Sequence, residues 1–155
     1  MPVLLNVQRE ISVADLLKQI PDDDDLQHWA QAAQLDGKQH LELTLRVVDT
    51  AEIQTLNRVF RHKDQTTNVL SFASDVPPGS GIDILGDIVI CAEIVAQEAE
   101  KYGKDLNHRW AHMLVHACLH VQGLDHEQEN ERANMEAEEI RILNALGIPD
   151  PYQLN

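Results

Sequence analysis

HACLHVQGLDH, residues 116–126, contains three histidines, with Gly123 between the second and the third. Residues four apart lie on one face of a helix, so His116 and His120 can direct their imidazoles at a common point. Gly123 is suited to end that helix, because glycine adopts a left-handed conformation at little steric cost. His126 can then turn back towards the same point. The stretch therefore predicts a helix, a glycine turn and a three-histidine metal site.

Three neutral imidazoles with an open fourth position are typical of a catalytic zinc site, and nickel also binds imidazole well. We expect one Zn²⁺ ion per chain, with Ni²⁺ as an alternative ion. His112 lies near the face of His116 and is also a candidate for the metal neighbourhood. The other interpretation is a polar stripe of histidines that holds no metal.

An open metal site favours hydrolysis, because a bound cation makes water more acidic and polarises carbonyl or phosphoryl oxygens. Zinc proteases of the HExxH type carry a glutamate base directly after the first histidine. Here that position is Ala117. A protease would therefore lack its base, and phosphodiester cleavage is favoured.

Length and composition are those of one globular domain over residues 1–155, since 43% of the residues are hydrophobic. The sequence shows neither a leader pattern nor an apolar run of about 20 residues, which predicts no membrane association. Cys91 and Cys118 form no paired spacing. We expect both to be small buried residues in a reducing, cytoplasmic compartment.

The net charge of −14 argues against a protein that binds nucleic acid over its whole surface. Residues 53–74 are locally basic, with Arg58, Arg61 and Lys63 against Asp64 alone. This stretch is the candidate for contact with a polyanion. Scattered surface charge is the alternative.

The hydrophobic pattern predicts an α+β protein, in which a mixed sheet of about four strands is covered by helices. Expected strands are residues 3–8, 41–47, 67–72 and 85–91, with the turn-rich residues 76–83 as a flexible loop. Expected helices are residues 26–34, 50–61, 92–102, 106–122 and 129–146.

Several residues have expected places in these elements. Acidic Asp22–Asp25 suit the first turn of a helix, and Asp49 suits a helix N-cap with Glu52 as its capping-box partner. The following helix would pack through one face, formed by Ile53, Leu56, Val59 and Phe60. Trp29 and Trp110 are expected in the core rather than as platforms for nucleobases.

Four blocks together resemble the bacterial YbeY family of metal-dependent endoribonucleases and ribosomal-RNA maturation factors. They are HACLHVQGLDH, FRHKDQTTNVLSF at 60–72, LGDIVI at 85–90 and LGIPDPY at 146–152, so the resemblance covers nearly the whole chain. The family usually has glycine at the position of Ala117 and tyrosine at that of Leu124. Both departures concern local packing and leave the histidine spacing intact.

The resemblance implies a zincin-like, metalloprotease-like fold in which His116, His120 and His126 hold zinc. It also implies that Arg61 is the important functional arginine, so Arg61 and His116 are the candidate catalytic residues. The implied substrate is single-stranded RNA, cleaved in maturation of the 3′ end of 16S rRNA and in ribosome quality control. Implied partners are the small ribosomal subunit, a basic ribosomal protein or an assembly GTPase.

Weaker candidates surround these residues. Lys63 can contact a phosphate, and Asn68 and Ser71 can orient the substrate, although turn and strand roles suit both equally. Asp125 can orient an imidazole by accepting a hydrogen bond from the ring nitrogen that does not bind the metal, or it can cap the turn. Asp87 is a candidate for burial beside the site.

The glutamates of the last helix, Glu139 among them, are expected to form a solvated face, with docking of a basic ribosomal protein as the alternative.

Two rival functions remain open. One is a metal-dependent peptidase or amidase whose base is Asp87 or Glu93. The other is a non-enzymatic ribosome-assembly factor in which zinc only fixes the fold. Structural zinc usually has four protein ligands, so a site with three favours an enzyme.

Overall fold

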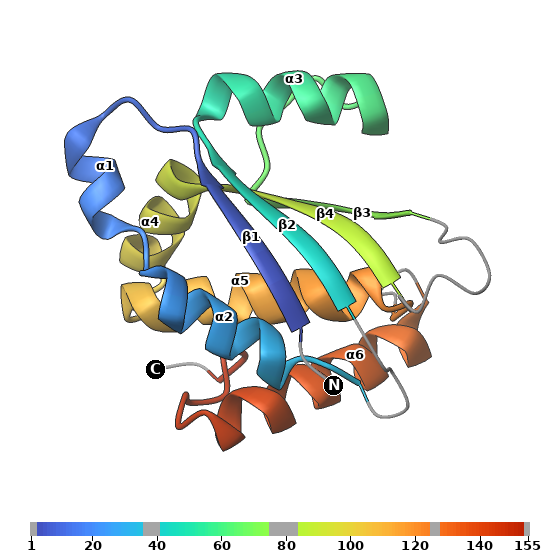
Figure 1. Cartoon of the computed structure of the whole chain (residues 1–155). Helices are drawn as coiled ribbons and strands as arrows, with labels where there is room; N and C mark the ends of the chain where they lie inside the picture. The colour runs from blue at the N-terminus through green and yellow to red at the C-terminus, as the bar shows by residue number, and fades with distance from the viewer. Residues whose placement is uncertain (1–2, 36–40, 75–83, 125–127, 154–155) are drawn as a thin grey trace.

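A four-stranded sheet forms the centre of the computed structural model, which describes residues 3–35, 41–74, 84–124 and 128–153 (Figure 1). The strands run in the order β1-β2-β4-β3, with β1 and β2 parallel, β2 and β4 parallel, and β3 antiparallel to β4. The expected mixed sheet in an α+β domain is thus confirmed. The strands are β1 (Val3–Arg9), β2 (Leu41–Val48), β3 (Val69–Ser74) and β4 (Ile84–Cys91).

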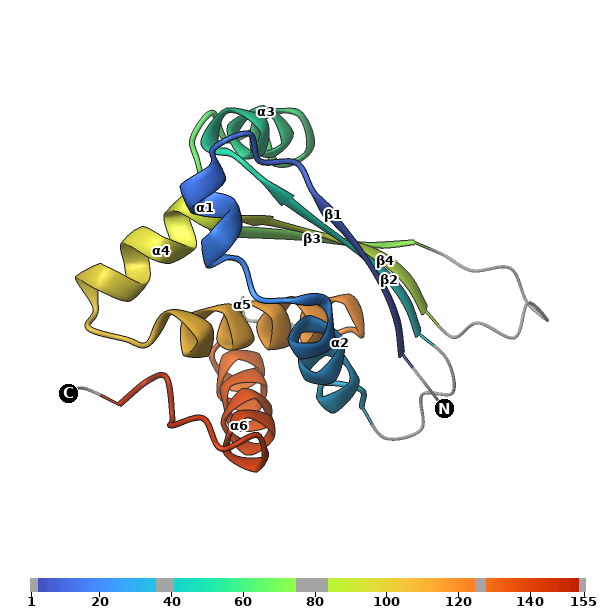
Figure 2. The same ribbon diagram turned by 60° about the vertical axis from the view of Figure 1, so that its left-hand side comes forward.

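The helices cover the two faces of the sheet unequally. Helix α3 lies on one face, whereas α2 and α5 lie against the other and α6 packs beneath α5 (Figures 1 and 2). None of the described helices combines the length and apolar character needed to cross a bilayer. The helices are α1 (Ala14–Gln19), α2 (Asp23–Ala32), α3 (Thr50–Arg61), α4 (Ala92–Lys101), α5 (Leu106–Val121) and α6 (Glu129–Ala145).

Helix α5 is the centre of the larger hydrophobic core. It is buried on most of its circumference, because the sheet lies on one side of it and α2 and α6 lie on others. Trp29 and Trp110 belong to this core, as expected, and both cysteines are buried and free. A smaller cluster, which includes Ile53 and Leu70, lies between α3 and the opposite face of the sheet.

Two helix starts follow the sequence signals. The carboxylate of Asp22 accepts a hydrogen bond from the Asp25 amide at 2.8 Å, and that of Asp49 accepts one from the Glu52 amide at 2.9 Å. Glu52 does not complete the expected capping box, because its carboxylate binds Arg46 on the neighbouring strand.

Other differences are small. Strand β3 begins two residues later than expected, and α1, which was not expected, has no buried residue.

The apolar face predicted for α3 ends early. Ile53 is fully buried, but Val59 and Phe60 are 54% and 59% exposed. The strands run away from α3 towards its C-terminal end (Figure 1), where the Phe60 ring contacts Phe72 of the edge strand. The expectation that all four apolar residues face the core is therefore wrong for the C-terminal pair.

Helix α5 ends at the glycine, as predicted. Gly123 has a φ of +109°, and its amide donates to the His120 carbonyl at 3.0 Å. The next amide, of Leu124, donates to the Leu119 carbonyl at 3.1 Å, which completes a Schellman motif. Asp125 and His126 lie outside the described residues, as do residues 76–83. The positions expected for them stay predictions.

Helix α3 ends differently, at a residue with a side chain in the left-handed region. His62 follows α3 with a φ of 60°. This conformation costs a residue with a Cβ roughly 1–2 kcal/mol, and glycine avoids that cost but loses about 0.5–1 kcal/mol through its greater freedom when unfolded. We expect His62→Gly to raise the free energy of unfolding by about 0.5–1 kcal/mol, measured by urea denaturation.

His62→Ala is the matched control, since it removes the imidazole but keeps the Cβ. It should show no gain in stability. Equal stability of the two variants would contradict a strained backbone at this position.

Candidate functional site

A pocket of about 440 Å³ lies at the edge of the sheet, between the end of α3, strand β3 and helix α5. Both described histidines of the predicted metal site line it, and so do the predicted arginine and lysine. None of the described residues in its lining is acidic. The residues important for its chemistry are Asn57, Arg61, Lys63, Ser71, His116 and His120.

Arg61 is held at the open edge of the sheet. The Asn68 carbonyl accepts a hydrogen bond of 2.9 Å from the Cys91 amide of β4. Because main-chain groups alternate in direction along an antiparallel strand, those of Ser71, three residues later, point away from β4. A guanidinium nitrogen of Arg61 donates to that Ser71 carbonyl at 2.9 Å. The guanidinium carbon lies 5.3 Å from the centre of the Phe72 ring. Arg61 is thereby positioned with further N–H groups available to an anion.

The segment after α3 is fixed by a buried amide. Asn57 is only 4% exposed and donates through Nδ2 to the Gln65 carbonyl at 3.0 Å. The Gln65 amide in turn donates to the Lys63 carbonyl at 2.9 Å. These bonds hold the main chain that presents Lys63 to the pocket.

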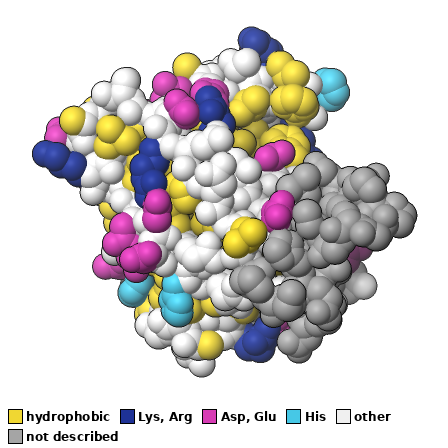
Figure 3. Space-filling view, viewed as in Figure 1, with side chains coloured by type: hydrophobic (Ala, Val, Ile, Leu, Met, Phe, Trp, Pro, Cys, Tyr) yellow, Lys and Arg dark blue, Asp and Glu magenta, His cyan; other side chains and the backbone are white. Residues whose placement is uncertain are grey.

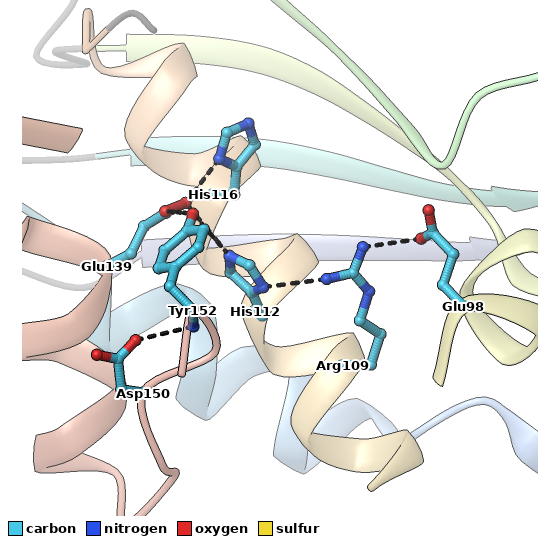
Figure 4. A network of polar contacts seen from close by, with 7 residues as sticks. All are labelled: Glu98, Arg109, His112, His116, Glu139, Asp150 and Tyr152. Atoms are coloured by element: carbon cyan, nitrogen blue, oxygen red, sulfur yellow. Dashed lines mark hydrogen bonds and ion pairs between the residues drawn. The ribbon is translucent and has the colours of Figure 1, made fainter. Parts of the chain in front are cut away.

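His116 is oriented by a carboxylate from α6. Its Nδ1 lies 2.7 Å from Oε1 of Glu139, whose side chain is completely buried (Figure 4). A carboxylate can only accept, so Nδ1 of the neutral imidazole carries the proton and Nε2 keeps its lone pair. The Nε2 atom lies on the side of the ring away from Glu139 (Figure 4). This is the arrangement common to histidines that bind a metal through Nε2.

A chain of hydrogen bonds from Arg109 through His112 and Tyr152 leads to Glu139. Arg109 donates to Nδ1 of His112 at 3.3 Å, so Nε2 of His112 is the protonated nitrogen and donates to the Tyr152 oxygen at 3.2 Å. The Tyr152 hydroxyl donates to Oε2 of Glu139 (Figure 4). Arg109 is itself anchored by Glu98 at 2.9 Å. His112 thus supports the site through both ring nitrogens.

The pKa shifts agree with these proton positions. Burial favours the neutral acid at Glu139, but hydrogen bonds from His112, His116 and Tyr152 outweigh it and lower the pKa of Glu139 to about 2. Burial and the bond to Glu139 raise the pKa of Tyr152 well above its ordinary value. Glu139 is therefore the ionised acceptor, and Tyr152 keeps its proton.

The described donors fit a zinc ion. His116 and His120 are one turn apart on α5 and line one pocket, and His116 has the tautomer that leaves Nε2 as a ligand. Within the described ranges, no group of three metal-binding side chains occurs, and the third predicted ligand, His126, falls outside them. The residues that would hold the ion are His116 and His120, joined by His126.

Other predicted residues are separated from the pocket. Asp87 is exposed, and it alternates along β4 with Gly86 and Ile88, which face α5, so it lies on the opposite face of the sheet. The expectation that Asp87 is buried beside the site is wrong. Glu93 is not among the described residues of the pocket lining, and Ala117 is fully buried in the core.

Asn68 also turns away from the pocket. Its amide donates to Glu98 at 3.1 Å, which agrees with the structural role that the sequence left open. Ser71 and Lys63 do line the pocket. Contact of these three residues with a substrate stays a prediction.

Sequence reasoning missed the residues behind His116. Glu139 was grouped with the solvated face of α6, yet it is 0% exposed. A signal was present: Met135, Glu139 and Ile142 follow helical spacing, and all three are buried, so Glu139 interrupts an apolar stripe. Tyr152 lies in the quoted block near the C-terminus, but nothing local connects it to the histidines.

The fold and the pocket define an α+β protein in which a histidine-bearing helix faces a cationic sheet edge. The chain matches the family described as endoribonuclease YbeY over residues 8–147, and it belongs to that family. Its members are endoribonucleases, hydrolases that act in ribosomal-RNA processing.

The fold is also similar to a solved structure. The solution structure of TM1509 from Thermotoga maritima is 21% identical, covers 97% of this chain and 99% of that chain, and gives a TM-score of 0.50. At this identity the likeness concerns the fold alone.

The hydrogen-bond directions predict the imidazole tautomers. In zinc-free protein at neutral pH, we expect His116 to be protonated at Nδ1 and His112 at Nε2, as measured from ¹⁵N chemical shifts by NMR. Tyr152→Phe removes one acceptor of His112, whose Nε2 also lies 3.5 Å from Glu139, and it leaves Glu139 as the partner of His116, so the His112 signals should change more than those of His116. A His116 ring protonated at Nε2 would contradict the arrangement with Glu139.

Proposed function

We propose that this protein is a zinc-dependent endoribonuclease specific for single-stranded RNA, which matures the 3′ end of 16S rRNA and acts in ribosome quality control. The observation that carries the proposal is the composition of the pocket. Two imidazoles lie across from Arg61 and Lys63, and no described lining residue is acidic. Such a pocket favours an anionic phosphodiester over a neutral amide.

Arg61 is suited to the scissile phosphate. A planar guanidinium binds phosphate oxygens through paired N–H groups, and the bond to Ser71 fixes its position before a substrate arrives. The charge that develops on the phosphate during cleavage would be stabilised by a group that needs no reorganisation. Lys63 adds a second, more mobile cation.

Zinc, when bound, supplies a Lewis acid and an acidified water molecule. The residues of the chain itself would orient the ligands of the ion. Glu139 holds the His116 ring by its Nδ1–H, and the Schellman turn at Gly123 ends α5 directly after the second histidine. The proposed ligand set is His116, His120 and His126, with nickel as an alternative ion.

The peptidase rival has less support. Its two candidate bases, Asp87 and Glu93, are not among the described residues that line the pocket. A peptide would also pair with the open edge of β3, where the Ser71 carbonyl already accepts from Arg61. Zinc-dependent cleavage of a peptide library, without cleavage of RNA, would favour this rival.

The second rival is a non-enzymatic ribosome-assembly factor. It would have the same partners as the proposed enzyme but would not cleave RNA. We propose that the small ribosomal subunit presents the RNA, with a basic ribosomal protein or an assembly GTPase as a further partner. The acidic residues of α6, such as Glu129 and Glu131, suit a basic protein. Tight binding of small subunits without metal-dependent cleavage would favour a scaffold.

Arg61→Ala should lower kcat/KM for single-stranded RNA by at least about 10²-fold, because one preorganised electrostatic donor is lost. Its zinc content should equal that of the wild type, since Arg61 is not a ligand. His116→Ala should lose both zinc and cleavage. RNA cleavage and metal content are measured on proteins purified side by side.

Arg58→Ala is the control, because this exposed arginine lies one turn earlier on α3 and does not line the pocket. Its kcat/KM should fall far less than that of Arg61→Ala. Loss of zinc from Arg61→Ala would mean that the role of Arg61 is misassigned, and unchanged cleavage by both pocket variants would refute the proposed site.

Glu139→Gln should weaken zinc binding by about 10- to 100-fold, as is usual when the partner of a ligating histidine is replaced. Competition with a metallochromic indicator measures the affinity, and circular dichroism verifies the fold. Glu138→Gln is the matched control, since Glu138 binds Arg141 at the surface of the same helix. Equal zinc affinity of both variants would exclude Glu139 as the group that positions His116.

A further inference from the structure

We propose that Phe60, supported by Phe72, is a stacking site for a nucleobase next to the scissile phosphate. The inference rests on the proposed function, and it adds a contact with the base to the contacts with phosphate and metal. It starts from an anomaly in the fold: Phe60 lies on the apolar face of α3, yet 59% of its side chain is exposed. Large apolar groups exposed beside a polar pocket often mark binding surfaces.

The ring of Phe60 is held in place by its neighbour. The centres of the Phe60 and Phe72 rings are 5.4 Å apart, and the planes meet at 62°, so the contact is edge to face. Phe72 is partly buried and packs against the cluster beneath α3. An edge-to-face contact occupies little of the Phe60 ring, and its exposure leaves room for a flat ligand.

The aromatic pair is continuous with the pocket through Arg61. Arg61 follows Phe60 in the chain, its guanidinium carbon lies 5.3 Å from the centre of the Phe72 ring, and its side chain lines the pocket. A nucleotide whose phosphate contacts Arg61 therefore has its base, or the next base, within reach of Phe60. Single-stranded nucleic acids are commonly bound by a cationic path with aromatic platforms along it.

The charged residues around the pocket indicate on which side of it RNA would bind. On the α3 side, residues 53–74 contain three cationic side chains against Asp64 alone, whereas α6 on the other side carries Glu131, Glu136 and Glu138. Figure 3 shows the hydrophobic side chains gathered over the outer end of α3, beside a histidine. A polyanion is favoured on this side, which argues for RNA over an acidic or neutral protein surface as the ligand of Phe60.

Short single-stranded RNA oligonucleotides test the site, each with one abasic nucleotide at a successive position around the cleavage point. For the wild type with zinc, one abasic position should raise KM by about tenfold, the effect of losing one base–aromatic stack. Phe60→Ala should raise KM for intact RNA by a similar factor at nearly unchanged kcat, and it should lose the sensitivity to that abasic position. Phe60→Trp should restore both.

Tyr102→Ala is the matched control, because Tyr102 is also an exposed aromatic, but the cations near its ring are Lys101 and Arg109 rather than Arg61 of the pocket. It should leave KM and the abasic pattern unchanged. Wild-type cleavage that is insensitive to Phe60→Ala overturns the stacking site alone and would leave this surface to a protein partner. Absence of both RNA binding and cleavage in the wild type overturns the proposed function together with the stacking site.

Discussion

The buried ion Glu139 is the constraint on which the site depends. A carboxylate removed from water is costly unless every oxygen has a partner, and here His116 donates to one oxygen while Tyr152 donates to the other. The donors come from α5 and from the segment after α6, so the same charge holds three parts of the chain together. Satisfying this carboxylate also selects the His116 tautomer in which Nδ1 carries the proton and Nε2 carries the lone pair. The Glu139 carboxylate therefore affects both the packing of α6 on α5 and the tautomer of His116.

The features that depend on neighbouring residues are predictable from the sequence, whereas the contacts between residues far apart in the chain are not. The four-residue spacing of His116 and His120 and the glycine after them report on a single helix and its end, which depend on backbone preferences within a few residues. The Glu139 contact joins residues 23 apart through the packing of α6 on α5. Its only local trace is a glutamate within an apolar stripe. The bond from Arg61 to Ser71 similarly requires knowledge of which carbonyls face the open edge of β3.

The position of the pocket follows from the topology of the sheet. Because β3 is an edge strand, helix α5 on one face and the end of α3 on the other can both reach around it, so imidazoles from one layer meet a guanidinium from the other. An open edge invites pairing with another strand, and Arg61 occupies one of its acceptors. The same contact that positions the cation therefore also discourages an extended peptide at the site.

An acidic protein that acts on RNA must combine weak general repulsion with strong local attraction. With a net charge of −14 and only Arg61 and Lys63 as cations in the described pocket lining, few counterions can be released, so phosphate contacts alone provide little affinity. The remaining binding energy has to come from contacts that do not depend on net charge. Exposed aromatic surface beside the cations meets this need, because stacking is tolerant of sequence and insensitive to the distant acidic residues. Repulsion elsewhere would then restrict RNA to the edge of the sheet at which we propose that cleavage occurs.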